Sequence, residues 1–486
     1  MSRRNFLKAG ALASAVGMMA AAPVAANAAA PTAVQAEDEE NGMLDVFGKK
    51  PKYVFLFIGD GMGMGHVMAT ETYNRLVLNN DENILMMQFP VASMAMTYSA
   101  NSPVTDSAAA GTALATGNKT KNGMIGMTPD SVAVTSIATE LKAQGYGVGL
   151  VTSVAYDDAT PASFYAHQTN RGMYEEINAD GAKCGFNFLG GAGTHVAEKS
   201  KEKAEQVFDN YRANGFTVVH GLDALNKANA GDKVLLTSHA PVTPNEIGYT
   251  VDSIAGALTL QQLTTACLDH LKKVSPEKFF MMVEGGNIDH AAHGNDGGAV
   301  VKEILNFNKC IRVAYDFYLQ HPEETLIVIT ADHDTGGMTV GVNNGPKNIT
   351  LKEMDCQKIS KEQFNDFCSK NGDFTWEQMK EAMSDKLGFW TKIGINEEEE
   401  ARMKESYDRM KAHDDRTQKT LYKEFWSFTA IVFDILNHKY GIGFTTTSHT
   451  GNPVPVFAIG EGCEEFKDLN NNIEIPQKIR ELTDLD

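Results

Sequence analysis

Residues whose types could do chemistry gather at five places in the chain, and several of these places directly follow an apolar run. Asp60 stands in Gly59-Asp60-Gly61, directly after the apolar residues 53–58. A carboxylate flanked by glycines can approach a cation without steric crowding. Gly-Asp-Gly is also an ordinary turn sequence, so this segment alone favours a turn.

Ser107 opens an alanine-rich stretch, Ser107-Ala108-Ala109-Ala110, which predicts a helix that begins at this serine. Free N–H groups and the helix dipole favour an anion at such a position. A serine hydroxyl placed there can attack phosphorus if its pKa is lowered. The alternative is that Asp106 or Ser107 only caps the helix.

A third segment, Asp158-Ala159-Thr160-Pro161, is followed by Arg171. Asp158 and Thr160 offer oxygen ligands of the kind that Mg²⁺ takes. Arg171 offers a planar fork that can grip two oxygens of a phosphate. The segment therefore predicts a site for a hard cation and an anionic substrate.

The most specific segment covers residues 283–293, Val-Glu-Gly-Gly-Asn-Ile-Asp-His-Ala-Ala-His. Glu284 ends a predicted buried strand, where an unpaired acid would be costly. Asp289 and His293 are four residues apart, so they share one face of a helical turn. Aspartate and histidine together are a common zinc pair. The alternative is a solvated turn that is rich in acids and histidines.

The fifth place combines Asp332-His333, after the apolar residues 326–330, with His449, which precedes another apolar run. These residues are further candidate metal ligands. We interpret the remaining histidines outside the candidate motifs as structural or solvated. They are His66, His167, His195, His220, His239, His270, His321, His413 and His438.

The elements that must position these residues follow an alternating pattern. Uninterrupted apolar runs at 53–58, 148–151, 279–283 and 326–330, with a weaker run at 455–459, are typical of strands covered on both faces. Helical patterns lie between them, at 132–144, 200–214, 259–273 and 299–319. The sequence therefore predicts an α/β fold with a large, mostly parallel central sheet and helices on both faces. Ligands of such a sheet bind beyond the carboxyl ends of its strands, which joins the five places into one site.

Residues 348–440 depart from this alternation and predict a helical insertion. The segment is charged, and Thr375 with Gln378 and Asn396 with Glu399 have capping-box spacing. Apolar residues recur at Leu421, Phe425, Phe428, Val432 and Ile435. The insertion is either a surface decoration or a cap over the site.

The net charge limits the possible partners, and the N-terminal residues indicate the location of the protein. A formal net charge of -19 argues against nucleic acid or an anionic membrane as a partner. Residues 1–28 combine Arg3-Arg4, an alanine-rich apolar run and Ala26-Asn27-Ala28, which predicts a twin-arginine-type export signal cleaved after Ala28. The apolar run is too short for a stable membrane anchor. Residues 29–50 are expected to be a linker, and the protein to be periplasmic or otherwise exported.

Together, these segments resemble the alkaline phosphatase family over about residues 50–465. The motifs Thr-Asp-Ser-Ala-Ala, Asp-Ala-Thr-Pro, Val-Glu-Gly-x-x-Ile-Asp-x-x-x-His, Thr-Ala-Asp-His and His-Thr-Gly occur in the family's order and spacing. The resemblance implies a catalytic domain over 51–465, interrupted by the insertion, and a C-terminal tail over 466–486. It also implies hydrolysis of small phosphomonoesters through a phosphoserine on Ser107, and a possible homodimer.

The resemblance further implies two zinc ions and one magnesium ion. The ligands carried over are Asp289, His293 and His449 for the first zinc, Asp60, Asp332 and His333 for the second, and Asp60, Thr160 and Glu284 for magnesium. Asp158 matches a position that holds magnesium-bound water, and Arg171 matches the phosphate clamp. His290 matches a phosphate-side position where bacterial members often carry lysine and animal members often carry histidine.

Four other functions compete with this interpretation. A sulfatase needs a C/S-x-P-x-R context, which Ser107-Ala108-Ala109-Ala110-Gly111 lacks. A nucleotide phosphodiesterase generally has a threonine nucleophile and no magnesium trio, and a metabolic mutase would not be exported. A non-catalytic binding protein for phosphate or metal would need no nucleophile beside the metals. Ser107, Thr160 and Glu284 favour the phosphomonoesterase.

Overall fold

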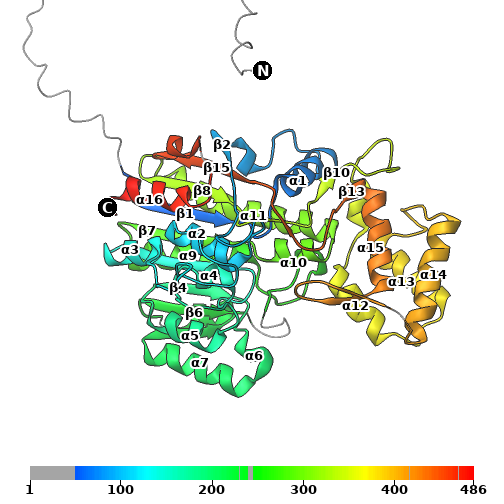
Figure 1. Cartoon of the computed structure of the whole chain (residues 1–486), viewed down its shortest axis with the longest axis horizontal. Coiled ribbons are helices and arrows are strands. Elements are labelled where there is room, and N and C mark those ends of the chain that lie inside the picture. Colours follow the sequence, from blue (N-terminus) through cyan, green and yellow to red (C-terminus); the bar gives the residue numbers. More distant parts are fainter. Residues whose placement is uncertain (1–49, 229, 239–244, 415, 469, 486) are drawn as a thin grey trace, which may run out of the picture. The chain divides into compact units, whose positions relative to one another are not determined.

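The computed structural model describes residues 50–228, 230–238, 245–414, 416–468 and 470–485 (Figure 1). The predicted export signal, and the predicted linker up to residue 49, lie outside the described residues. Within them, none of the helices is both long enough and apolar enough to cross a membrane.

A nine-stranded sheet organises the described part of the chain. Its strands, in spatial order, are β2 (Val91–Ala95), β15 (Val454–Gly460), β8 (Thr325–Thr330), β1 (Tyr53–Ile58), β7 (Phe279–Glu284), β3 (Gly147–Thr152), β4 (Phe188–Gly191), β6 (Lys233–Thr237) and β5 (Phe216–His220). The strands from β8 to β5 pair in parallel, whereas β15 is antiparallel to both β8 and β2. The predicted α/β class with a mostly parallel sheet is therefore confirmed.

All five predicted strands are present, because each uninterrupted apolar run is buried on both faces of the sheet. β1, β3, β7 and β8 are buried along their whole length. The sequence did not reveal β2, β4, β5 and β6, which lie toward the two edges.

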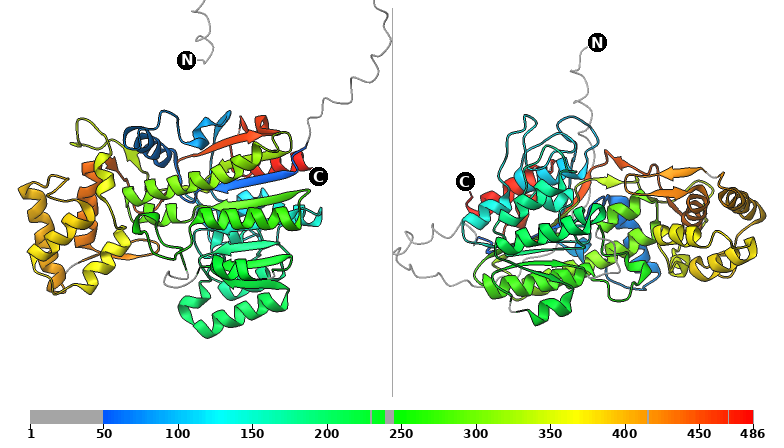
Figure 2. Two further views of the ribbon diagram at one scale, coloured as in Figure 1. Left: turned by 180° about the vertical axis from the view of Figure 1, so that it is seen from behind. Right: turned by 90° about the horizontal axis from the view of Figure 1, so that it is seen from below.

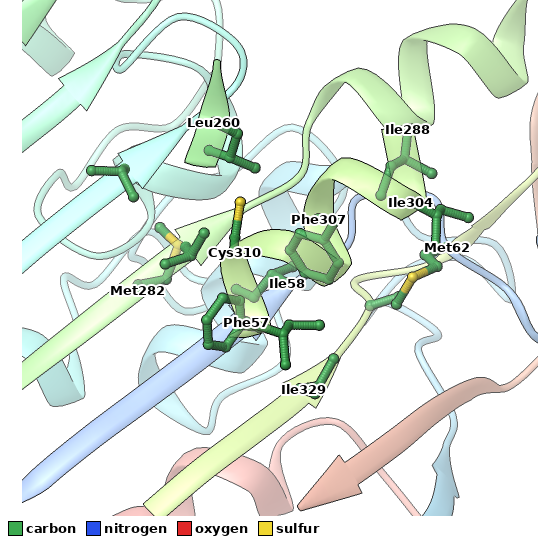
Figure 3. Close-up of a cluster of buried hydrophobic side chains, with 14 of the residues drawn as sticks. Phe57, Ile58, Met62, Leu260, Met282, Ile288, Ile304, Phe307, Cys310 and Ile329 are labelled. Carbon is green, nitrogen blue, oxygen red and sulfur yellow. The ribbon is translucent and has the colours of Figure 1, made fainter. Parts of the chain in front are cut away.

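Helices cover both faces of the sheet (Figure 2). Two long helices, α9 (Leu260–Val274) and α11 (Gly297–Tyr318), pack together on one face. A cluster with Phe57, Phe307 and Cys310 fills the space between α11 and the sheet (Figure 3). Helices on the other face include α2 (Ser107–Thr116), α3 (Ile137–Ala143), α4 (Ala159–Ala162) and α16 (Glu474–Thr483).

Three of the four predicted helices between the strands are confirmed, and one is shorter than expected. The pattern at 132–144 gives only α3, because the Ser136 side chain caps the helix by accepting a hydrogen bond from the Thr139 N–H. Ser131, just before it, has a positive φ of 62° that a helix does not allow. The other patterns correspond to α7 (Lys201–Ala213), α9 and α11.

Residues 348–440 contain four α-helices in the described part of the segment (Figure 1). They are α12 (Lys361–Lys370), α13 (Trp376–Leu387), α14 (Glu397–Lys411) and α15 (Ser427–Tyr440). Both predicted capping boxes are present. Leu421 and Phe425 do not belong to a helix, because they lie in a hairpin formed by β11 (Thr417–Lys419) and β12 (Glu424–Trp426).

Candidate active site and metal centre

Three adjacent central strands bring the buried acids of the site together. Ile58 of β1 is in register with Glu284 of β7 and with Thr330 of β8. Asp60 and Asp332 therefore follow their strands at the same level, and the Gly61 N–H donates to Asp332 Oδ1 over 3.0 Å. The carboxyl edge of the sheet holds these three carboxylates, as predicted from the ends of the apolar runs.

Six of the predicted ligands form two compact groups. Asp289, His293 and His449 make one group, and Asp60, Asp332 and His333 make the other. Within each group, one ligand atom of every residue lies within 4.8 Å of the others. Asp289 and His293 stand on α10 (Asn287–His293), where His293 Nε2 is 3.3 Å from Asp289 Oδ2.

Hydrogen bonding in the first group fits a cation. His293 Nδ1 lies 2.6 Å from the Thr447 carbonyl, and His449 Nδ1 lies 2.9 Å from the Thr105 carbonyl. Because a carbonyl only accepts, each Nδ1 carries a proton. The two Nε2 atoms face each other at 3.0 Å. With both Nδ1 atoms engaged by carbonyls, the two Nε2 atoms are placed to serve as ligands of one cation.

Unpaired oxygen atoms in both groups lead to the same conclusion. Asp60 Oδ1, Asp289 Oδ2 and Asp332 Oδ2 are buried and have no hydrogen-bond partner among the described residues. Burial raises the pKa of Asp60 well above its usual range, and the charge of Asp332 raises it further. Uncompensated buried carboxylates are costly, so this donor set fits metal ions.

A third set, Asp60, Thr160 and Glu284, offers oxygen atoms only. Glu284 accepts a hydrogen bond from the Thr152 hydroxyl, and burial raises its pKa to about 8. Thr160 Oγ1 is buried without a hydrogen bond of normal geometry in the described chain. Oxygen ligands without nitrogen suit Mg²⁺ better than zinc.

Ser107 is the first residue of α2, and its hydroxyl faces the second group. Asp106 caps the helix by accepting from the Ala109 N–H over 3.0 Å, which leaves the Ser107 hydroxyl free of that task. Ser107 Oγ lies 3.1 Å from His333 Nε2. The structure thus places the hydroxyl at both a helix N-terminus and a metal-ligand group, which is the arrangement a nucleophile needs.

Arg171 and His290 line a cavity of about 660 Å³. Asp106, the residue that precedes Ser107, also lines this cavity. Arg171 Nη2 donates to Asp158 Oδ1 over 2.9 Å, so the guanidinium is held in one orientation. His290 Nδ1 lies 3.2 Å from Glu246 Oε2. Burial lowers the pKa of His290, but the Glu246 carboxylate has the opposite and larger effect, so the pKa is raised.

His195 and Tyr422 are among the residues of this cavity that were not predicted from the sequence as site residues. His195, which the sequence analysis interpreted as structural or solvated, lines the cavity with its Nε2 3.3 Å from Asp158 Oδ2. Its ring also stacks on Tyr174. Tyr422, from the hairpin of the insertion, lies against His290 with ring centroids 4.0 Å apart. No local pattern marks either residue, because each contact joins distant parts of the chain.

A parallel sheet whose carboxyl edge carries a serine, an arginine and two metal-ligand groups defines a metal-dependent hydrolase of the α/β class. The sequence pattern of the alkaline phosphatase family matches residues 51–187 and 192–485, so the chain belongs to this family. The protein is a metal-dependent phosphomonoesterase, which works through the family's phosphoserine intermediate. The sulfatase, phosphodiesterase, mutase and binding-protein alternatives are thereby set aside.

Relatives of known name share most of the chain's length. Alkaline phosphatase 4 of Bacillus subtilis is 30% identical over 436 residues, which cover 87% of this chain and 86% of the relative. Human tissue-nonspecific alkaline phosphatase is 28% identical over 333 residues, covering 58% and 63%. The crystal structure of a cold-active alkaline phosphatase from Shewanella sp. aligns with a TM-score of 0.75 and 28% identity, covering 89% of this chain and 99% of that one.

Proposed function

We propose that Ser107 is the nucleophile of this phosphomonoesterase and that Arg171 and His290 bind the phosphoryl group. The observation that carries the assignment is the Ser107 hydroxyl at a helix start, 3.1 Å from His333 of the second ligand group. Asp158 orients Arg171, so the guanidinium group is already positioned to bind two phosphate oxygens.

The three ligand sets support two zinc ions and one magnesium ion. The groups Asp289/His293/His449 and Asp60/Asp332/His333 mix nitrogen and oxygen donors, which zinc prefers. Asp60, Thr160 and Glu284 would hold magnesium, with Asp158 accepting from its water. A solved TAB5 alkaline phosphatase variant, 25% identical to this chain, has magnesium bound in its M3 site. When bound, the ions supply cationic charge that favours the serine alkoxide and neutralises the departing oxygen.

The reaction proceeds in two displacements. Ser107 Oγ forms a bond to phosphorus while the ester P–O bond breaks, and the departing oxygen takes up a proton and leaves as an alcohol. Water then attacks the phosphoserine, the bond between Ser107 Oγ and phosphorus breaks, and inorganic phosphate is released. Throughout, Arg171 stays against the phosphoryl oxygens and offsets their negative charge.

This site also accounts for an anionic substrate in an acidic protein. The net charge of -19 would repel phosphomonoesters at long range, so positive charge must be concentrated at the site itself. Arg171 provides part of it, and metal ions held by the ligand groups would provide the rest. The predicted twin-arginine signal and periplasmic or other exported location, and the possible homodimer, remain part of this proposal.

The test is Ser107→Ala, with Ser163→Ala as the matched control. Ser163 is also a buried serine near α2, but its hydroxyl donates to the Ala159 carbonyl over 2.8 Å. We expect Ser107→Ala to lower p-nitrophenyl phosphate turnover by about 1000-fold or more at unchanged metal content, since the hydroxyl reacts but does not hold the ions. Ser163→Ala should keep its activity. Labelled phosphate trapped on a residue other than Ser107 would refute the assignment.

A further inference from the structure

The hairpin of the insertion, residues 417–426, places one aromatic side chain against His293 of the first metal-ligand group. Tyr422 lies in the turn between β11 and β12. Its ring centroid is 4.0 Å from that of His290 and 5.2 Å from that of His293, which it meets edge to face at 81°. Tyr422 nevertheless remains 37% exposed. One side of the ring is therefore covered by the site and another is open to the cavity.

A buried lysine holds this hairpin against the helix that carries Asp289 and His293. Lys361 is 3% exposed, and its Nζ donates to the Gly294 carbonyl at the end of α10 over 2.7 Å. The same Nζ donates to Gln418 Oε1 of β11 over 2.9 Å and lies 4.6 Å from the ring centre of Phe425. One ammonium group thus contacts both α10 and the two strands of the hairpin.

A second set of contacts fixes the hairpin to α12. Lys423 forms an ion pair with Glu362, and the Trp426 N–H donates to Asn365 Oδ1 over 2.9 Å. Within the turn, the Thr420 hydroxyl donates to the Lys423 carbonyl over 2.8 Å. Tyr422 is therefore presented by a braced turn, and its ring position is set before any ligand arrives.

The cavity beside Tyr422 has the size and lining of a subsite for an organic group. Its volume of about 660 Å³ is much larger than a phosphate ion requires. Most of its lining residues are charged or polar, and besides Tyr422 the side chains of Tyr174, Tyr249 and Phe425 contribute aromatic rings. Aromatic rings in the lining favour an aromatic ligand, because stacked and edge-to-face ring pairs add to the burial of apolar area.

The position of Tyr422 corresponds to the leaving-group side of the reaction. Ser107 faces the group that contains His333, whereas Tyr422 contacts His293 of the other group. In phosphoryl transfer the attacking and leaving oxygens stand roughly in line on opposite sides of phosphorus. A leaving group opposite Ser107 is therefore directed toward Asp289, His293 and His449, where Tyr422 covers the site.

We propose that Tyr422 is a specificity-determining residue whose ring packs against the leaving group and favours phosphomonoesters of aromatic alcohols. The inference rests on the proposed roles of Ser107 and Arg171. It assigns to the insertion a direct contact with substrate, made by a side chain that belongs to none of the metal-ligand groups.

The experiment compares phenyl phosphate with ethyl phosphate in the metal-loaded enzyme and in two variants. Tyr422→Leu removes the ring, and Tyr422→Phe keeps it. We expect Tyr422→Leu to lower kcat/KM for phenyl phosphate about five- to tenfold and for ethyl phosphate less than about twofold, which is the range of one aromatic contact. Tyr422→Phe should keep the wild-type ratio of the two substrates. Lys419→Ala, an exposed change in the same hairpin, is the matched control and should leave the ratio unchanged.

Each other outcome overturns the inference. An equal loss for both substrates in Tyr422→Leu would show that the residue supports the site without touching the leaving group. A loss in Tyr422→Phe as large as in Tyr422→Leu would assign the contact to the hydroxyl and contradict a ring contact. Failure of the proposed function is distinguishable, because it would show as full activity in Ser107→Ala whatever happens at Tyr422.

Discussion

Replacing His195 with glutamine should make the protein's stability depend less on alkaline pH. The side chain of His195 is 11% exposed, and its Nε2 lies 3.3 Å from Asp158 Oδ2. Burial alone would lower the pKa of His195, but the nearby carboxylates of Asp158 and Glu198 raise it from 6.5 to about 10. The folded protein therefore keeps a proton on this ring at a pH where the unfolded chain has lost it.

The sign and size of the effect follow from this difference. A group whose pKa rises on folding stabilises the folded state fully below its unfolded pKa, here 6.5, and loses that contribution as pH rises through the folded pKa, about 10. A shift of one pKa unit corresponds to about 1.4 kcal/mol. The rise from 6.5 to about 10 therefore limits the contribution of His195 to the free energy of unfolding to roughly 5 kcal/mol. Arg171 also pairs with Asp158, and we expect this shared charge to reduce the measured effect to about 3 kcal/mol.

The assay is urea unfolding of the wild type and His195→Gln between about pH 6.5 and pH 10.5. Both proteins should be stripped of metal, because metal affinity itself changes with pH. We expect the difference in the free energy of unfolding to shrink by about 3 kcal/mol across this range. A ring-proton NMR titration of His195 gives its pKa directly.

His270→Gln is the matched control. His270 is also a mostly buried histidine, but burial lowers its pKa, so it is neutral throughout the alkaline range. The difference between the wild type and His270→Gln should stay constant with pH. If the His195→Gln difference is equally constant, or if the ring of His195 titrates near 6.5, the charge pairing with Asp158 is refuted.

Three further predictions concern the phosphate clamp, the magnesium site and a close contact at Gly63. Arg171→Ala should weaken inhibition by inorganic phosphate about tenfold or more at unchanged metal content, and Arg171→Lys should restore only part of it for lack of a fork; an unchanged inhibition constant would contradict this role. Asp158→His should allow zinc to bind beside Thr160 and should reduce the activation of the enzyme by magnesium. Anomalous diffraction on both sides of the zinc edge identifies the bound metal, and an activity assay with added magnesium measures the activation. A strong zinc signal at this site in the wild type would contradict a magnesium site. Gly63→Ala should lower the melting temperature by several degrees, since its Cβ would lie 1.8 Å from Asp334 Oδ1, while Gly231→Ala, with nothing within 4 Å, should not; equal melting temperatures would refute the clash.

The sequence predicts the central strands well because burial on both faces leaves a simple signal. β4 shows why the others escape it, since Phe188-Leu189-Gly190-Gly191 is indistinguishable from a turn. The structure gives a reason for Gly191, where a Cβ would come within 2.7 Å of the Val154 carbonyl oxygen. A close backbone approach of this kind depends on the tertiary fold and leaves only a glycine in the sequence.

The candidate ligands are predictable for a related reason. Asp60, Glu284 and Asp332 each stand at or just after the end of a buried strand, where an acid is conspicuous. His195 and Tyr422 have no such context, since one precedes a short helix and the other lies in a turn. Their partners are 37 and more than 100 residues away, and neither periodicity nor spacing encodes contacts of that length.

Two short ladders at the base of the insertion have a consequence for how the family can diversify. β9 (Asp334–Thr335) pairs with β14 (His449–Thr450), and β10 (Thr339–Val340) pairs with β13 (Ile442–Gly443). The chain on both sides of the insertion is thereby joined within a few residues of His333 and His449. The length and sequence of the segment between the ladders can therefore change while the metal ligands keep their positions. The insertion is accordingly an exchangeable module on which selection for new substrates can act without rebuilding the catalytic metal centre.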